Sequence, residues 1–138
     1  MRYYLDTNIV VFLLIDNDNI SKDVFEIIND YDNIFYISTV VAKEIVHLHK
    51  RGVIKESRFK TSKDVLKAIE RTGIIIKPLN ECHIQKYAEI NIPVEKHNDP
   101  NDHVIIAQAI AERIPVISSD RKFELYASQG LKFIYNQK

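Results

Sequence analysis

Short apolar runs alternate along this chain with longer segments in which apolar residues recur at helical spacing. The runs have the length of buried strands and lie at 3–5, 34–37, 74–76, 114–118 and 133–135. Apolar positions three and four residues apart predict helices at 9–14, 22–28, 39–51, 80–90, 100–113 and around 123–125, and one or two more within 53–72. Strands that alternate with helices predict an α/β fold, in which right-handed crossovers place helices on both faces of a parallel sheet.

Composition narrows the class of protein. A length of 138 residues, with 46% hydrophobic and 28% charged residues, predicts one globular domain over residues 1–138. No apolar run approaches the length of a membrane span, and the N-terminus lacks the pattern of a secretory signal. The only cysteine, Cys82, excludes an internal disulfide and suits a reducing compartment. We therefore expect a cytoplasmic protein without a membrane partner.

Charge is balanced overall but unevenly distributed. The chain has 19 basic and 19 acidic residues, yet residues 16–32 hold six acids and a single lysine. Residues 43–67 hold eight Lys or Arg, three acids and two histidines. Two interpretations of this basic segment stay open, a solvated helical hairpin or a phosphate-binding surface.

Acidic residues follow two of the predicted strands at their carboxyl ends. Asp6 ends the first apolar run, and Thr7 and Asn8 then supply cap chemistry for the next helix. Asp120 follows the fourth run after Ser119. Either aspartate could serve only as a helix cap. A carboxylate in this position nevertheless faces the crevice where open α/β sheets bind ligands.

Glu44 interrupts the apolar face of the helix that Ser38 or Thr39 caps. It lies four residues from both Val40 and Leu48, and therefore on their stripe. It is too far from Ser38 for a capping box, which places its Glu three residues after the cap. A glutamate on a core-facing stripe is costly unless it is paired or binds a metal. The alternative is a side chain at the edge of the stripe that reaches water.

The segment His97-Asn98-Asp99-Pro100-Asn101-Asp102-His103 opens the next helix. Asp99 and Pro100 are typical of an N-cap and a first helical position, and Asp102 then occupies the third position, where a carboxylate stabilises the helix dipole. Both aspartates could be capping residues alone. Asp102 also precedes the apolar pair 105–106 by three and four residues, which places it on the inward face. Asp99 is expected to cap the helix and to help shape a site.

These four inward or strand-end acids are expected to converge, and crowded carboxylates repel unless a cation lies between them. Mg²⁺ and Mn²⁺ prefer oxygen ligands, and such a site can activate a water for attack on a phosphodiester. The histidines show no zinc spacing. Glycine loops for nucleotide phosphates and a Gly-x-Ser-x-Gly elbow are also lacking.

Four motifs, in order along nearly the whole chain, resemble those of the PIN-domain ribonucleases, especially the VapC-type toxins of bacterial toxin–antitoxin pairs. They are Leu5-Asp6-Thr7-Asn8, Ser38 with Glu44, His97-x-Asp99-Pro100-x-Asp102 continuing through residues 105–109, and Ser119-Asp120. The third motif of the family commonly has Phe and Arg where this chain has Asn101 and His103.

The resemblance implies a three-layer α/β/α sandwich with a central parallel sheet, and an endoribonuclease that depends on Mg²⁺ or Mn²⁺. The implied catalytic acids are Asp6, Glu44, Asp102 and Asp120, of which Asp6, Asp102 and Asp120 would hold the metal and Glu44 would position the attacking water. The implied supporting residues are Thr7, Asn8, Ser38, Asp99 and Ser119.

The resemblance also implies partners. RNA is the expected substrate, with Lys50, Arg51 and Lys55 of the basic segment as candidate backbone contacts. A small antitoxin is expected as a protein partner, because residues 9–14 are apolar all round and one helix face cannot bury them all. Self-association through the same surface is compatible with a homodimer.

Two other functions remain to be weighed. A non-catalytic module of the same fold could bind RNA or protein, although the presence of all four acids argues against it. A phospho-receiver domain also uses acids at strand ends. That class expects an acidic pair after the first strand and an acceptor Asp after a middle strand, and residues 6–8 and 37–38 supply neither.

Overall fold

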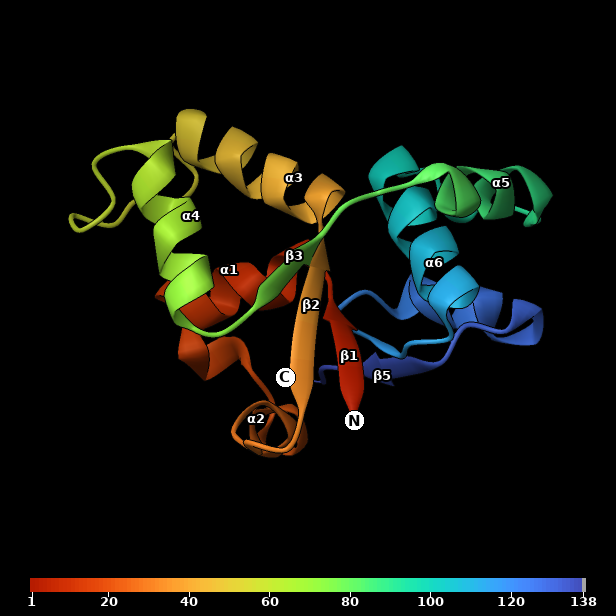
Figure 1. Cartoon of the computed structure of the whole chain (residues 1–138), viewed down its shortest axis with the longest axis horizontal. Coiled ribbons are helices and arrows are strands. Elements are labelled where there is room, and N and C mark those ends of the chain that lie inside the picture. Colours follow the sequence, from red (N-terminus) through yellow and green to blue (C-terminus); the bar gives the residue numbers. More distant parts are fainter. Residues whose placement is uncertain (138) are drawn as a thin grey trace.

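A five-stranded parallel sheet forms the centre of the molecule (Figure 1). The computed structural model describes residues 1–137. The strands are β1 (Arg2–Leu5), β2 (Ile34–Ser38), β3 (Ile75–Lys77), β4 (Val116–Ser118) and β5 (Phe133–Tyr135). Their spatial order is β3-β2-β1-β4-β5, and each adjacent pair is parallel. β1 is therefore the central strand, and β3 and β5 form the edges.

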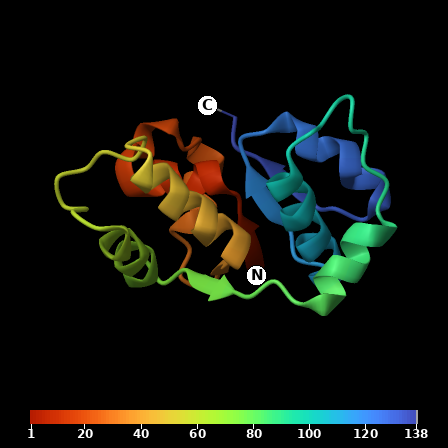
Figure 2. The same ribbon diagram turned by 90° about the horizontal axis from the view of Figure 1, so that it is seen from above.

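Helices cover both faces of this sheet. On one side lie α1 (Thr7–Ile15), α3 (Thr39–Lys50) and α4 (Ser62–Arg71), and on the other lie α5 (Glu81–Glu89), α6 (Pro100–Glu112) and the 3-10 helix η2 (Arg121–Gln129) (Figures 1 and 2). The short η1 (Asn17–Asn19) and α2 (Lys22–Ile28) continue the connection from α1 to β2. The predicted α/β/α sandwich is confirmed. Within residues 1–137, no helix has both the length and the apolar character needed to cross a membrane.

The path of the chain creates a switch point beside β1. The chain moves outward from β1 through β2 to β3, then returns across the sheet to β4 on the opposite side of β1. Leu5 pairs with Ile117, so the residues that follow them, Asp6 and Ser118, lie side by side. Open α/β sheets bind ligands outside the carboxyl ends of their strands at such a point.

Local signals explain most helix boundaries, with two corrections. The side chain of Asp6 caps α1, because its carboxylate accepts a hydrogen bond from the Thr7 N–H, whereas Thr7 and Asn8 were expected to supply the cap. Residues 53–61 form no helix, and α4 begins in a capping box between Thr61 and Asp64. The capping box satisfies backbone N–H groups that the helix leaves without partners.

The hydrophobic core lies in two layers, one on each face of the sheet. Fully buried side chains on one face come from α1, α3 and α4, and those on the other come from α6 and η2; they include Ile9, Val10, Val41, Ile45, Val65, Ile69, Ile105, Ile106, Phe123 and Tyr126. Helix α6 buries every residue from 105 to 109. This close packing holds its first turn, and therefore Asp102, in place against the sheet.

A polar cluster around Glu112 joins the second helical layer to the sheet. The Tyr4 hydroxyl donates to Glu112 and accepts from the Gln108 amide, and Lys77 forms an ion pair with the same carboxylate. His83 Nε2 lies 3.1 Å from Glu112. Burial acts to raise the pKa of Glu112, but the hydrogen bonds from Lys77 and Tyr4 hold it below its usual value. The cluster ties α5 and α6 to β1 and β3.

Candidate active site

The structure brings the four predicted acids together in one crevice at the switch point. Asp6, Glu44, Asp102 and Asp120 line a hollow of about 320 Å³, together with Asp99 at its rim, and we call this hollow the acidic crevice. Asp6 comes from the end of β1, Glu44 from α3, Asp102 from the first turn of α6, and Asp120 from the end of β4. Acids that are far apart in the sequence therefore share one site.

Asp6 is the most deeply buried of these acids, with 4% of its surface exposed. One carboxylate oxygen accepts from the Thr7 N–H at 2.8 Å, and the other accepts from the Ser118 hydroxyl at 2.6 Å. Burial, with the nearby charge of Asp102, raises the pKa of Asp6 to about 7. Sequence reasoning missed Ser118. The signal that could have found it is a serine at the last position of an otherwise apolar strand, where its side chain is completely buried.

Glu44 and Asp102 approach the crevice from α3 and α6. The Thr7 hydroxyl donates to Glu44 at 3.1 Å, and burial raises the pKa of Glu44. Glu44 thus lines the crevice instead of extending from the stripe edge into open solvent. Burial also raises the pKa of Asp102 to about 7, with further contributions from the charges of Asp99 and Asp120. A carboxyl group with a pKa of about 7, such as that of Asp102, is partly protonated at neutral pH, and a nearby cation would favour its ionised form.

Asp99 and Asp120 are helix caps that also line the crevice. Asp99 accepts from the backbone N–H of Asn101 at 3.0 Å, and Asp120 accepts from that of Lys122 at 2.9 Å. In both cases one carboxylate oxygen makes the cap, which leaves the other available to a ligand. Capping and ligand binding are therefore compatible at these positions.

Of the other predicted supporting residues, Asn8 lines the crevice, whereas Ser38 and Ser119 do not. Ser38 is fully buried and caps α3 by accepting from the Val40 N–H at 3.1 Å, which places Glu44 in the second turn. Asn8 accepts from the backbone N–H of Ser119 at 3.4 Å and joins the start of α1 to the end of β4. The Ser119 hydroxyl accepts from Asn136 at 2.9 Å.

A buried histidine, His97, lies behind Asp102, and sequence reasoning missed it. Ligand atoms of His97, Asp102 and Asp120 lie within 4.8 Å of one another. His97 Nε2 is 3.1 Å from Asp102 Oδ2, and its Nδ1 is 2.8 Å from the Tyr126 hydroxyl. Burial lowers the pKa of His97 and raises that of Tyr126 to about 12. His103, at the position where the family commonly has Arg, lies 2.8 Å through Nε2 from the His97 carbonyl oxygen.

Basic side chains lie next to the acidic crevice. Glu44 also lines a second hollow of about 250 Å³, which it shares with Lys43, His47 and Asn101. Further along α3, a hollow of about 550 Å³ is lined by His49, Lys50, Lys60, Thr61, Ser62 and Lys63. The candidate contacts Lys50, Arg51 and Lys55 are all exposed.

Solved structures with the same fold include three bacterial complexes. In the crystal structure of VapBC2 from Rickettsia felis bound to a DNA fragment from its promoter, one chain is 23% identical, with a TM-score of 0.73 and coverage of 99% of this chain and 100% of that one. DNA-bound VapBC from Salmonella typhimurium contains a chain with 17% identity, a TM-score of 0.71 and 99% coverage of both chains. VapBC-1 from nontypeable Haemophilus influenzae contains a chain with 19% identity, a TM-score of 0.69 and 100% coverage of both chains.

Comparison of the sequence gives the family directly. No curated protein matches this chain significantly. Residues 3–128, which include all four acids of the crevice, match the model of the PIN domain. The chain therefore belongs to the PIN-domain family.

Proposed function

We propose that this protein is a metal-dependent endoribonuclease that hydrolyses RNA phosphodiester bonds and acts as the toxin of a type II toxin–antitoxin pair. The observation that carries the proposal is the convergence of Asp6, Glu44, Asp102 and Asp120 in one crevice of a PIN-domain chain. Its placement in the cytoplasm and its extent as one domain over residues 1–138 stay predictions.

The donor set of the acidic crevice fits a hard divalent cation. It consists of carboxylate oxygens, and burial together with the charges of neighbouring acids raises the pKa values of Asp6 and Asp102, a penalty that a bound cation would relieve. Asp6, Asp102 and Asp120 would hold Mg²⁺ or Mn²⁺. The bound ion would supply Lewis acidity, which lowers the pKa of a bound water and neutralises charge on the phosphate.

The residues of the crevice would divide the remaining work. Hydrogen bonds from Thr7 and Ser118 hold the Asp6 carboxylate in one orientation. Glu44 is held by the Thr7 hydroxyl at the mouth of the crevice, where it would accept a hydrogen bond from the attacking water and take its proton. The raised pKa of Glu44 brings its basicity closer to what general base catalysis near neutral pH requires.

The first test is cleavage of a generic single-stranded RNA by the purified chain. We expect cleavage with Mg²⁺ or Mn²⁺ and none with a chelator. Asp6→Asn should abolish it, and Glu44→Gln should lower kcat by about 10²- to 10⁴-fold, because the water loses its base. Asp32→Asn, an exposed aspartate outside the crevice, is the matched control. RNA binding without cleavage in either metal would instead support the non-catalytic module.

The raised pKa values also predict how stability depends on pH. Unfolded aspartates lose their protons near pH 4, whereas folded Asp6 and Asp102 keep theirs up to about pH 7. The folded state binds more protons in this interval, so the free energy of unfolding should fall as pH rises from about 4 to about 8 without metal. The rise in pKa from the usual aspartate value to about 7 corresponds to a loss on the order of 4 kcal/mol for one such carboxyl group.

Chemical denaturation at several pH values, with a chelator and with millimolar Mg²⁺, measures this dependence. Metal binding to the folded state should restore the stability lost at high pH. Asp102→Asn should flatten the pH dependence and shrink the gain from Mg²⁺, while Asp32→Asn should change neither. An equal Mg²⁺ gain in wild type and Asp102→Asn would remove Asp102 from the proposed metal site.

The basic surface next to the crevice is proposed to bind the RNA backbone. Charge reversal of Lys50, Arg51 and Lys55 together should weaken RNA binding and flatten its dependence on salt, because fewer counterions are released. Fluorescence anisotropy at several salt concentrations measures both effects. The control reverses Arg2, Lys22 and Lys132, which are also exposed but lie outside the basic segment. If the RNA affinity and its dependence on salt are unchanged, the basic segment does not bind RNA, and its interpretation as a solvated helical hairpin is favoured.

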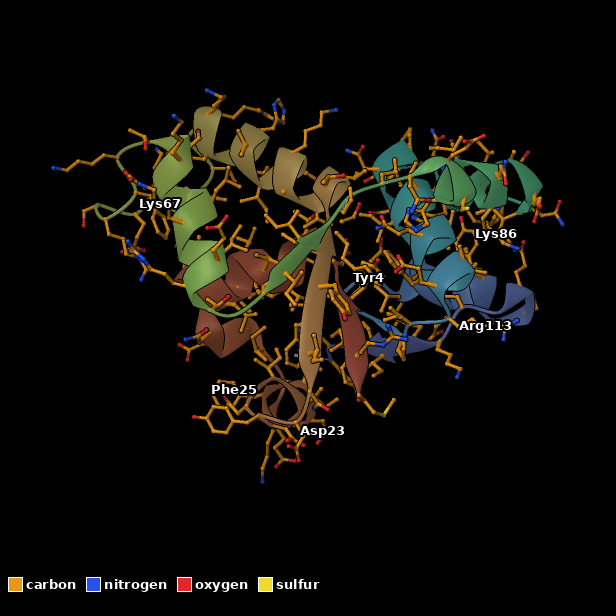
Figure 3. The ribbon with its side chains drawn as sticks, viewed as in Figure 1. Tyr4, Asp23, Phe25, Lys67, Lys86 and Arg113 are labelled. Atoms are coloured by element: carbon orange, nitrogen blue, oxygen red, sulfur yellow. The ribbon has the colours of Figure 1, made fainter. Side chains whose placement is uncertain are left out.

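An antitoxin is proposed as the protein partner, and two adjoining surfaces support it. An apolar groove of about 790 Å³ lies between α1, α2, β2 and β3 and is lined by residues that include Leu13, Phe25, Ile34 and Ile75. Phe25 projects from α2 at the edge of the molecule and is 44% exposed (Figure 3). Val11 and Phe12, which come directly before Leu13 in α1, line the acidic crevice and not the groove.

A single partner segment could therefore occupy both surfaces across α1. Its apolar residues would fill the groove, and an Arg would pair with Asp6 or Asp102 in the crevice. The VapBC complexes with a similar fold are themselves described with DNA from a promoter or with bound DNA, which fits a partner that also carries a DNA-binding part. A homodimer through the same helices remains a prediction.

Co-expression with a candidate antitoxin, sought as a small protein encoded beside this chain, tests the partner. We expect a stable complex without ribonuclease activity. Phe25→Asp combined with Ile75→Asp should abolish the complex and leave cleavage intact, because the groove lies outside the acidic crevice. Ile84→Asp places the same charge on an exposed isoleucine of α5 and should have no effect. Failure to co-purify, with a chain that is harmless when expressed alone, would contradict the toxin assignment.

A further inference from the structure

We propose that His97 is a positioning residue for the metal site: together with Tyr126, it fixes the carboxylate of Asp102 and directs the free oxygen into the acidic crevice. This inference rests on the proposed nuclease function. It assigns a task to a buried histidine that opens the third motif but is not one of the four predicted acids.

The contact between His97 and Asp102 uses one side of the carboxylate. Asp102 Oδ2 is 3.1 Å from His97 Nε2. The His97 side chain is 1% exposed and the Asp102 side chain is 13% exposed. Among residues 1–137, no group donates a hydrogen bond to Oδ1 of Asp102. Asp102 also lines the acidic crevice, so Oδ1 is the oxygen left for a cation. The histidine thus removes the rotational freedom that would let the two oxygens exchange.

The direction of the hydrogen bonds follows from the chemistry of the three groups. With a cation in the crevice Asp102 is ionised and only accepts, so His97 Nε2 must then carry the hydrogen. The neutral ring then has its lone pair on Nδ1, and the Tyr126 hydroxyl, 2.8 Å away, donates to it. Asp102 thus fixes the ring tautomer, and the hydrogen bond that Tyr126 donates stabilises it. Metal-site carboxylates are typically held by outer hydrogen bonds of this kind.

The same contacts argue against His97 as a metal ligand. Ligand atoms of His97, Asp102 and Asp120 are close enough for one ion, but both ring nitrogens of His97 already have partners. A metal on Nε2 would displace the hydrogen that binds Asp102. His97 does not line the crevice either, whereas both aspartates do.

The surroundings of His97 hold the ring in this position. His103 lies 2.8 Å through Nε2 from the His97 carbonyl oxygen, and the His97 N–H donates to the Pro93 carbonyl at 2.8 Å. The ring packs edge-on against Tyr126, with centroids 5.5 Å apart, and against His103 at 4.9 Å. The substitution of His for the common Arg at position 103 thereby contributes to holding the loop before α6.

Three variants of the full chain separate positioning from packing. His97→Phe keeps a buried ring but removes the N–H, His97→Gln restores an amide N–H near the position of Nε2, and Tyr126→Phe removes only the hydroxyl. Tyr4→Phe is the matched control, because Tyr4 is also a buried, hydrogen-bonded tyrosine but lies in the Glu112 cluster. Calorimetric titration with Mn²⁺ is the main measurement, with kcat and KM for RNA cleavage as the second.

We expect His97→Phe to weaken Mn²⁺ binding by about 10- to 100-fold and to lower kcat at saturating metal, with little change in KM for RNA. His97→Gln should recover part of the Mn²⁺ affinity. Tyr126→Phe should reduce the affinity by a smaller factor, and Tyr4→Phe should leave it unchanged even if the melting temperature falls.

Several results would overturn the inference. Wild-type Mn²⁺ affinity in His97→Phe would show that His97 does not orient Asp102, and wild-type affinity in Tyr126→Phe would show that the Tyr126 hydroxyl has no part in it; either result contradicts the inference as stated. A loss of affinity in His97→Gln as large as in His97→Phe would show that the N–H is not enough, and would assign the effect to the packing of the imidazole ring. Should His97→Phe fail to fold, Tyr126→Phe alone decides between the outcomes. A wild-type chain that neither binds Mn²⁺ nor cleaves RNA would refute the proposed function, whereas normal wild-type behaviour with unaffected variants refutes only the role of His97.

Discussion

Removal of carboxylates from water at one edge of the sheet is the constraint on which the rest of the structure depends. Asp6 is almost fully buried at the end of the central strand, and burial raises its pKa to about 7. Two hydrogen bonds, from Thr7 and Ser118, offset only part of the cost of burying a charge. The folded chain therefore keeps an unfavourable group in place, and such strain is typical of functional sites.

The same atoms serve the fold and the proposed chemistry. Helices α1 and η2 start directly after β1 and β4, whereas α6 starts after the loop that follows α5, and the capping residues of all three helices lie at the edge where ligands bind. Asp6, Asp99 and Asp120 cap these three helices and also line the acidic crevice. A capping role is therefore no argument against a functional role at these positions.

The surfaces around the crevice differ in chemistry according to the element that supplies them. Helix α3 and the residues that follow it provide basic side chains on one flank, including Lys43 and Lys50. Helix α1 provides apolar side chains, because its sequence has no polar face after Asn8. An RNA backbone fits the basic flank, and an apolar protein segment fits the groove beyond α1. The proposed substrate and the proposed inhibitor would thus approach the same acids from different sides.

The sequence by itself determined the α/β/α architecture and the strand-end position of the acids. Apolar runs and helical periodicity involve only residues close together in the sequence, so they can be recognised without the fold. The order of strands and helices then restricts the topology to few alternatives. The resemblance to the PIN-domain ribonucleases added the identity of the four acids, and the family match bears out the family itself. The sequence did not reveal that residues 53–61 form turns and no helix, because a segment of charged turns and a short helix have similar local patterns.

Only the tertiary structure decided which polar groups meet. Ser118 reaches Asp6 because β4 pairs with β1, and the two residues are 112 positions apart. His97 meets Tyr126 across 29 residues because a loop folds over η2. Glu44 has the same spacing on its helix whether it faces a crevice or solvent, and only the packing of α3 beside α1 distinguishes the two. Local sequence specifies the direction of a side chain on its own element, whereas its partners depend on how distant elements pack.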